Sequence, residues 1–144
     1  MKTNLQPDVS NQSNRVYAKS DSTSEGPGPR VMGATTLVGN EVCDRQDENL
    51  GKIHEIMLDT ATGHVAYAVL AAGGFLGVGD KYFAIPWEML ELDTDYKQFT
   101  LNISKDELKQ APGFDKDHWP SMADTTWAEE IHGYYKTTPY WERN

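Results

Sequence analysis

Short apolar runs, separated by turn residues, follow one another through residues 31–103, and this rhythm limits the folds that the chain can adopt. It is typical of antiparallel β strands, because a helix needs apolar residues three or four positions apart over a longer stretch. The runs cover residues 36–43, 52–59, 65–71, 81–86, 89–93 and 97–103. Six strands in about seventy residues predict a mainly β fold, a small six-stranded antiparallel barrel, because closure removes free strand edges.

Two of these runs depart from simple alternation, and each departure makes a prediction. In residues 52–59 the apolar positions slip by one, and a β-bulge near His54 and Glu55 would restore the register. Residues 65–71 are apolar on both faces, which predicts a strand that is covered on both sides. The barrel interior covers one face, so another part of the chain is expected to cover the other.

Residues 104–144 are predicted to form a helical and aromatic extension. Ser104 and Glu107 have the spacing of a capping box, and the short helix that they begin would end at Pro112. Asp124 can cap a second helix. The apolar stripe of that helix would consist of Trp127, Ile131 and either Tyr134 or Tyr135. Because three of the four tryptophans lie here, we expect this extension to pack on the barrel or on a second subunit.

The length of 144 residues suits one domain with flanking segments. Residues 1–30 are polar and rich in Ser and Asn, which predicts a disordered tail or a linker to a partner, and residues 31–103 are assigned to the barrel. No run approaches the roughly 20 apolar residues of a membrane span, and no signal-peptide pattern begins the chain. We therefore expect a soluble, cytoplasmic protein. Its single cysteine, Cys43, is predicted to be buried.

The whole chain has a net charge of -9, and the predicted folded part alone carries the negative charge. Residues 1–30 carry four basic and three acidic side chains, which leaves nine basic and nineteen acidic side chains in residues 31–144. Affinity for nucleic acid and for anionic lipid comes largely from Lys and Arg. The charge therefore argues against nucleic acid as a partner and against direct membrane insertion.

The glycine-rich stretch GGFLGVGDK, residues 73–81, raises the possibility of a phosphate-binding loop. Such a loop needs glycine before its lysine, a small hydroxyl residue after it and a following helix. Here Asp80 precedes Lys81, Tyr82 follows it, and a strand is predicted next. We interpret the stretch as a wide hairpin turn. Its apolar tip, which folds back or meets a partner, consists of Phe75, Leu76 and Val78.

Residues 37–90 carry a series of features in a specific order and spacing. These are Gly39, Glu41, Val42, Gly51, Lys52, Ile53, Asp59, Thr62, Gly63, His64, Val65, the glycine-rich hairpin and the AIPW run at residues 84–87. In these features the chain resembles a stand-alone member of the PRC-barrel domain family. That family is named after the photosynthetic reaction centre H subunit, whose cytoplasmic part has the fold. The resemblance implies a six-stranded barrel that acts as an adaptor between macromolecules, with no shared catalytic residues.

The histidines are the natural places to look for metal or acid-base chemistry. Glu129 and His132 have the E-x-x-H spacing that places two ligands on one helical face, but a carboxylate-bridged metal pair needs two such motifs. The DKDH run at residues 115–118 offers oxygen and imidazole ligands, and solvation or helix capping explains it more simply. We therefore expect no metal, no cofactor and no catalytic residues.

Together these features predict a non-enzymatic interaction module that forms a homodimer, or binds a protein partner through its C-terminal extension. The candidate interaction surface consists of Phe75, Leu76, Val78, Trp119, Trp127, Ile131, Tyr134, Tyr135, Tyr140 and Trp141. The alternative is a small-molecule binding protein, because a pocket between barrel and extension could be lined by aromatic side chains. Its lining would be Trp119, Trp127, Tyr135 and Trp141.

Overall fold

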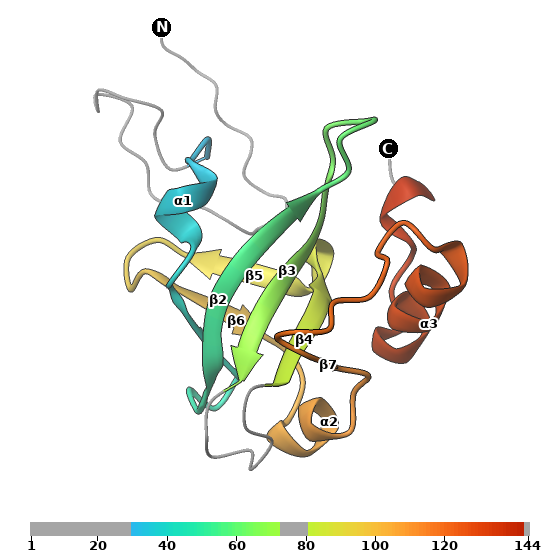
Figure 1. Ribbon diagram of the computed structural model, residues 1–144. Coiled ribbons are helices and arrows are strands. Elements are labelled where there is room, and N and C mark those ends of the chain that lie inside the picture. Colours follow the sequence, from blue (N-terminus) through green and yellow to red (C-terminus); the bar gives the residue numbers. More distant parts are fainter. Residues whose placement is uncertain (1–29, 73–80, 143–144) are drawn as a thin grey trace, which may run out of the picture.

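The computed structural model describes residues 30–72 and 81–142, which form one strongly curled β sheet and several short helices (Figure 1). Within these residues the sheet has seven strands in the order β5-β6-β1-β2-β3-β4-β7. In Figure 1, β5 and β6 cross behind β2 and β3. The strands are β1 (Glu41–Cys43), β2 (Asn49–Leu58), β3 (Val65–Ala72), β4 (Lys81–Pro86), β5 (Leu90–Asp93), β6 (Gln98–Leu101) and β7 (Phe114–Asp115).

This sheet corrects the predicted six-stranded, antiparallel, closed barrel in three respects. The seventh strand is β7, which comes from the C-terminal extension and pairs with the edge of β4. The sheet is mixed, because β1 pairs in parallel with β6. It is not closed among the described strands, since β5 and β7 stand at opposite ends of the strand order. The first predicted run is also divided, because Ala34–Leu37 forms the short helix α1 and the strand begins at Glu41.

The predicted bulge in β2 is confirmed. The register between β2 and β3 shifts between Ile53 and Glu55, so that His54 has no opposite residue. Three residues before His54, Gly51 has a φ of +141°, and a Cβ there would lie 2.2 Å from the carbonyl oxygen of Ala71. The close approach of β2 to β3 therefore requires glycine at this position.

The core confirms that β3 is buried on both faces. Its residues Ala66, Tyr67, Ala68, Val69 and Leu70 are each at most 4 % exposed. Cys43 is buried as predicted, and this burial, reinforced by nearby Glu41, raises the pKa of its thiol. The largest fully buried apolar side chains are Val42, Leu50, Ile53, Tyr67, Leu70, Phe83, Ile85, Phe99, Leu101, Leu108 and Ile131.

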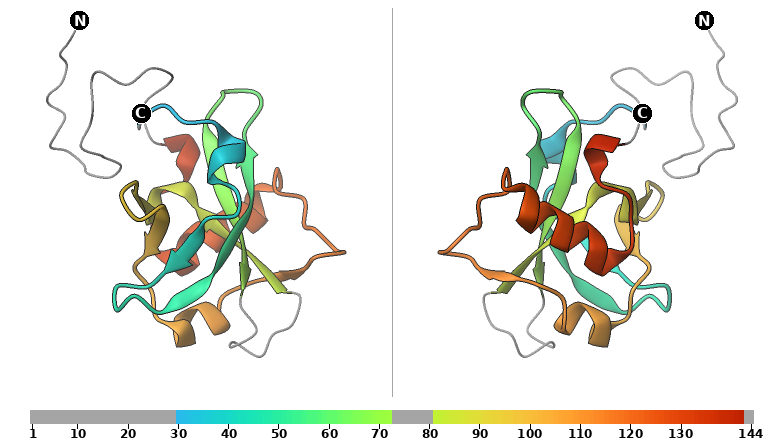
Figure 2. Two further views of the ribbon diagram at one scale, coloured as in Figure 1. Left: turned by 90° about the vertical axis from the view of Figure 1, so that its left-hand side faces the viewer. Right: turned by 90° about the vertical axis from the view of Figure 1, so that its right-hand side faces the viewer.

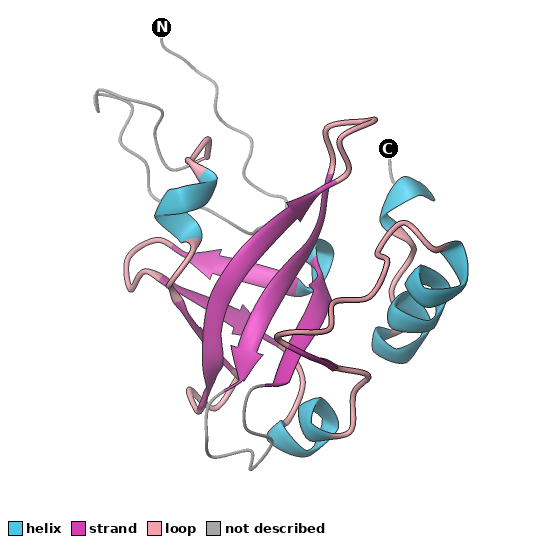
Figure 3. Cartoon of the chain, viewed as in Figure 1, coloured by secondary structure: helices cyan, strands magenta, loops and turns pink. Residues whose placement is uncertain are grey.

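The two predicted helices are present (Figure 3), and each has its predicted capping residue. Helix α2 (Lys105–Lys109) begins with a full capping box, in which Ser104 and Glu107 each accept the other's backbone N–H. Helix α3 (Thr125–Tyr135) is capped by Asp124. Two 3-10 turns, η3 (Trp87–Met89) and η4 (Tyr140–Glu142), complete the described structure.

Helix α3 lies across the strands on the side of the sheet that faces away from the barrel interior (Figure 2, right). Its N-terminal part contacts the outward-facing Tyr67 of β3 through Trp127. The chain then reverses after Tyr135 and returns along the helix to η4. The second face of β3 is therefore covered by residues of the C-terminal extension.

Candidate functional site

The residues of the predicted interaction surface fall into separate environments. Phe75, Leu76 and Val78 lie outside the described residues. Ile131 and Tyr135 are 1 % and 6 % exposed and belong to the core. Tyr134 is partly buried, and its hydroxyl donates to the Glu107 carbonyl oxygen, which ties α3 to α2. The aromatic residues that remain divide into two clusters on the outer face of the sheet.

The covered cluster, as we call it, consists of Tyr67, Trp127, His132, Tyr140 and Trp141. The Tyr67 ring lies 5.4 Å from Trp127, 5.5 Å from His132 and 5.9 Å from Tyr140, measured between ring centroids. Trp141 lies 5.6 Å from His132, and it is 40 % exposed at the outer edge of the cluster. The edge-to-face angles of most pairs are those that aromatic quadrupoles prefer, so the rings are well packed.

Polar bonds hold the covered cluster together. The His132 ring is 2 % exposed, with Nδ1 2.8 Å from the Ala128 carbonyl oxygen and Nε2 3.3 Å from the Tyr140 backbone nitrogen. The Tyr140 hydroxyl donates to the Asp59 carboxylate at 2.7 Å, which ties η4 to the β2–β3 turn. This hydrogen bond lowers the pKa of Asp59, whereas burial and then the bond to Asp59 raise the pKa of Tyr140 to about 12.

Two buried tyrosine hydroxyls have no hydrogen-bond partner among the described residues. One belongs to Tyr67 in the covered cluster, and the other to Tyr135 in the core. Burial raises the pKa of both phenols, with smaller contributions from Tyr140 and Tyr134 respectively. Both side chains are therefore neutral at physiological pH, and neither provides a charged catalytic group.

The exposed cluster consists of His54, Tyr82, Phe114 and Trp119. The Trp119 ring lies 5.2 Å from Phe114, 6.0 Å from Tyr82 and 6.3 Å from His54, and Tyr82 and His54 are 4.6 Å apart. Trp119 is 39 % exposed, and its indole N–H donates to the Lys116 carbonyl oxygen at 2.7 Å. The indole ring is thus held in one orientation while a large part of it faces solvent.

Local structure explains how these residues meet. The bulge at His54 gives this residue no opposite neighbour on β3, and it reaches Tyr82 on β4. The β4–β7 pairing sets Phe114 opposite Tyr82, and Trp119 follows a tight turn after β7. Sequence reasoning found Trp119 but missed Tyr82 and Phe114. It also missed Tyr67 as a member of the covered cluster and Asp59 as the hydrogen-bond partner of Tyr140, although the alternation of residues 65–71 places Tyr67 on a separate face from Ala66 and Ala68.

The four rings proposed to line a small-molecule pocket do not share ring contacts. Trp119 belongs to the exposed cluster. In the covered cluster, Trp127 contacts Tyr67 and Trp141 contacts His132. The ring contact of Tyr135 is with Tyr134.

The positions considered for metal binding have other partners. Both ring nitrogens of His132 face backbone groups, which removes this side chain from an E-x-x-H site with Glu129. His118 and Asp115 are exposed, with 3.8 Å between the imidazole Nδ1 and the carboxylate. Within residues 30–72 and 81–142, no group of three or more His, Cys, Asp or Glu side chains is placed to hold a metal ion.

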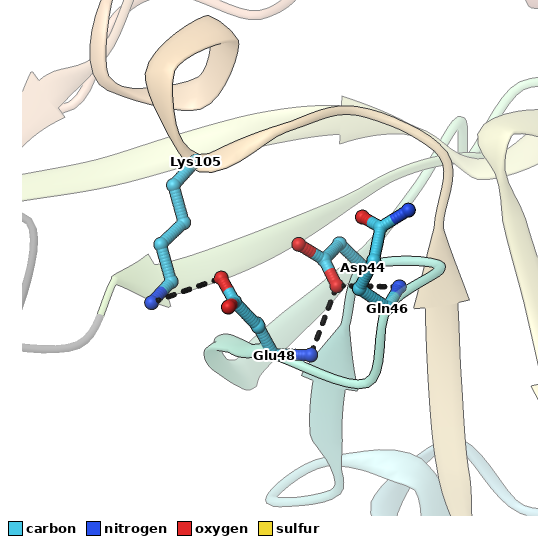
Figure 4. Close-up of polar contacts among 4 residues, drawn as sticks. All are labelled: Asp44, Gln46, Glu48 and Lys105. Carbon is cyan, nitrogen blue, oxygen red and sulfur yellow. Dashed lines mark hydrogen bonds and ion pairs between the residues drawn. The ribbon is translucent and has the colours of Figure 1, made fainter.

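A buried carboxylate shapes the β1–β2 turn, and its role is structural (Figure 4). Asp44 is 5 % exposed and accepts the backbone N–H groups of Gln46 and Glu48, each at 2.9 Å. Glu48 forms an ion pair of 3.3 Å with Lys105 at the start of α2. The Oδ1 atom of Asp44 thus fixes the turn, and the ion pair joins the turn to the extension.

The curled mixed sheet with a helical cover defines a small β domain that presents aromatic side chains on its outer face. The PRC-barrel domain matches residues 29–108, more than half of the chain, and the chain therefore belongs to the PRC-barrel family. The resemblance noted in the sequence is confirmed.

Among solved structures, the chain is similar to a 16S ribosomal RNA processing protein, RimM, from Pseudomonas aeruginosa. The two are 18 % identical with a TM-score of 0.39, and the match covers 52 % of this chain and 45 % of RimM. The chain thus spans less than half the length of that relative. A comparison with curated proteins found no match. None of the helices in the described part of the chain is long and apolar enough to cross a membrane.

Proposed function

We propose that this chain is a non-enzymatic interaction module and that the exposed cluster is its binding surface. The observation that carries the proposal is the partly exposed Trp119 ring. Its own hydrogen bond orients it, and it contacts three further rings. Trp and Tyr side chains dominate binding energy at protein interfaces, because they bury a large area at little cost in conformational entropy. Binding free energy is most favourable where such rings are already ordered, because less conformational entropy is lost when the partner binds.

A second copy of this chain is the first partner that we propose. The net charge of -9 would oppose self-association if it were concentrated at the interface. The residues that flank the exposed cluster in sequence are of mixed sign, so that two copies can meet there without a block of like charge. They are Lys52, Glu55, Lys81, Asp115, Lys116 and Asp117.

Light scattering on the full chain at micromolar concentration tests this proposal. We expect the mass of a dimer for the natural sequence and the mass of a monomer for Trp119→Ala. Tyr96→Ala is the matched control, because Tyr96 is 76 % exposed on the β5–β6 turn, and this variant should remain a dimer. A monomeric natural chain would reject the second copy as partner, and a dimeric Trp119→Ala would reject the exposed cluster as the dimer interface.

A further inference from the structure

His132 lies at the centre of the covered cluster, and its two ring nitrogens contact backbone groups of opposite kinds. Nδ1 is 2.8 Å from the Ala128 carbonyl oxygen, and a carbonyl can only accept, so Nδ1 carries a hydrogen. Nε2 is 3.3 Å from the Tyr140 backbone nitrogen, which can only donate, so Nε2 presents its lone pair. The two partners therefore specify a single neutral tautomer of the imidazole.

We propose that His132 is a proton-operated lock for residues 136–142, the segment that follows α3. A proton added at Nε2 turns this acceptor into a donor that faces the Tyr140 N–H, so the hydrogen bond between them is lost. The proton also places a positive charge on a side chain that is 2 % exposed. The backbone of residues 136–142 then loosens around Tyr140.

The groups that face the His132 ring offer the added charge no counter-ion. Tyr67 from β3 and Tyr140 and Trp141 from η4 lie 5.5, 6.1 and 5.6 Å away, and none carries a negative charge near neutral pH. The Asp59 carboxylate, on the β2–β3 turn, accepts from the Tyr140 hydroxyl rather than from the imidazole. The remaining charged groups of the neighbouring elements are exposed to solvent, except for the partly buried Glu88. They are His64 on the β2–β3 turn, Glu129 and Glu130 on α3, Lys136 after it and Glu142 on η4.

Two further hydrogen bonds determine how far the segment opens. The Tyr140 hydroxyl is bonded to Asp59, and the Thr137 hydroxyl donates to Glu88 at 3.3 Å. The lowered pKa of Asp59 keeps its carboxylate ionised in mild acid, so the bond to Tyr140 survives there. Protonation of His132 therefore loosens the backbone around Tyr140 without unfolding the sheet. The lock would operate whatever the exposed cluster binds.

Hydrogen exchange of the Tyr140 amide in the full chain, followed by NMR, reads this lock directly. The measurement compares about pH 7.5 with about pH 5.5, on either side of the range in which histidines titrate. We expect the protection factor of the Tyr140 amide, which is corrected for the slower intrinsic exchange in acid, to fall about tenfold or more. The amide of Leu70 in β3 should keep its protection. Unchanged protection at Tyr140, or an equal fall at Leu70, would overturn the proposal.

Two variants distinguish the effect of protonating His132 from that of protonating His64. His132→Gln can present an acceptor to the Tyr140 N–H and cannot be protonated, so Tyr140 protection should no longer depend on pH. His64→Gln removes the exposed histidine next to Tyr140 and should behave as the natural chain does. The reverse pattern would assign the effect to His64 and reject the lock.

A third measurement covers the case in which His132→Gln does not fold. In the natural chain, the ring ¹⁵N shifts of His132 should show the proton arriving at Nε2 over the pH interval in which Tyr140 loses protection. If the two events occur in different intervals, the proposal is wrong.

Discussion

The covered and exposed clusters both combine Tyr, Trp and His side chains on the same face of the sheet, but they differ in how their polar atoms are satisfied. Tyr67 and Tyr82 share this face, because Tyr82 pairs with Ala71, four residues after Tyr67 on β3. In the covered cluster, His132 and Tyr140 bond to backbone and to Asp59, which fixes the C-terminal segment. Among the described residues of the exposed cluster, a local bond from the Trp119 indole to the Lys116 carbonyl oxygen orients the largest ring. Long-range polar bonds therefore distinguish the covered cluster, whereas the exposed cluster has rings that are held locally and face solvent, which is why we propose it as the binding surface.

The largest expected difference between the clusters is in stability. Trp127→Ala removes a ring that packs edge-to-face on the buried Tyr67, and we expect the free energy of unfolding to fall by about 2–4 kcal/mol. Trp119→Ala should cost less than about 1 kcal/mol, because the ring is 39 % exposed. Urea denaturation of both variants measures this. Equal losses would remove the distinction between the two clusters.

A smaller effect should appear in the pH dependence of the covered cluster. The pKa of Asp59 is lowered by the Tyr140 hydroxyl, so the stabilisation is present above the ordinary value of 3.8 and is lost as pH falls through the lower folded pKa. The pKa of Tyr140 is raised from 10 to about 12, so its contribution is lost as pH rises through that interval. Tyr140→Phe should flatten both ends of the profile.

The melting temperature as a function of pH measures this effect, and Tyr82→Phe in the exposed cluster is the control. The control should keep the profile of the natural chain. A Tyr140→Phe profile that follows the natural one at both ends would show that the bond to Asp59 contributes nothing to stability.

The smallest effect concerns the turn that brings the C-terminal segment back over α3. Lys136 has a φ of 58° in the left-handed region, where its N–H closes the end of the helix on Gly133. Glycine adopts this conformation without the steric cost that a lysine incurs, although it loses more chain entropy on folding. Because the relief of strain exceeds the entropy loss, Lys136→Gly should raise the free energy of unfolding by about 0.5–1 kcal/mol. Partner binding should not change. A destabilised variant would mean that the lysine side chain contributes more than the strain costs.

Local sequence signals predicted most of the individual elements. The run at residues 81–86 matches β4, the slip at His54 is a bulge, and Ser104 and Asp124 cap their helices. Each of these signals lies within a few residues of the structure that it predicts, which is why sequence reasoning found them.

Pairing between distant segments was beyond the reach of such signals. Strand β7 has two residues and no alternating pattern, and its pairing with β4 joins residues more than thirty positions apart. The parallel pairing of β1 with β6 is also non-local. The same limit applies to the site, because Tyr67 and Trp127 meet only after the extension folds back over β3. The sequence could predict that the tryptophans pack against the domain, but it could not predict which cluster each of them joins.

The most direct test is a co-purification that compares two tryptophans of nearly equal exposure. Trp119 is 39 % exposed in the exposed cluster, and Trp141 is 40 % exposed at the edge of the covered cluster. A tagged chain is used to capture a differently tagged copy and the proteins of the native lysate. We predict that a bound protein is retained by the natural chain and by Trp141→Ala and is lost by Trp119→Ala. Equal recovery by all three, or loss through Trp141→Ala alone, would contradict the assignment of binding to the exposed cluster.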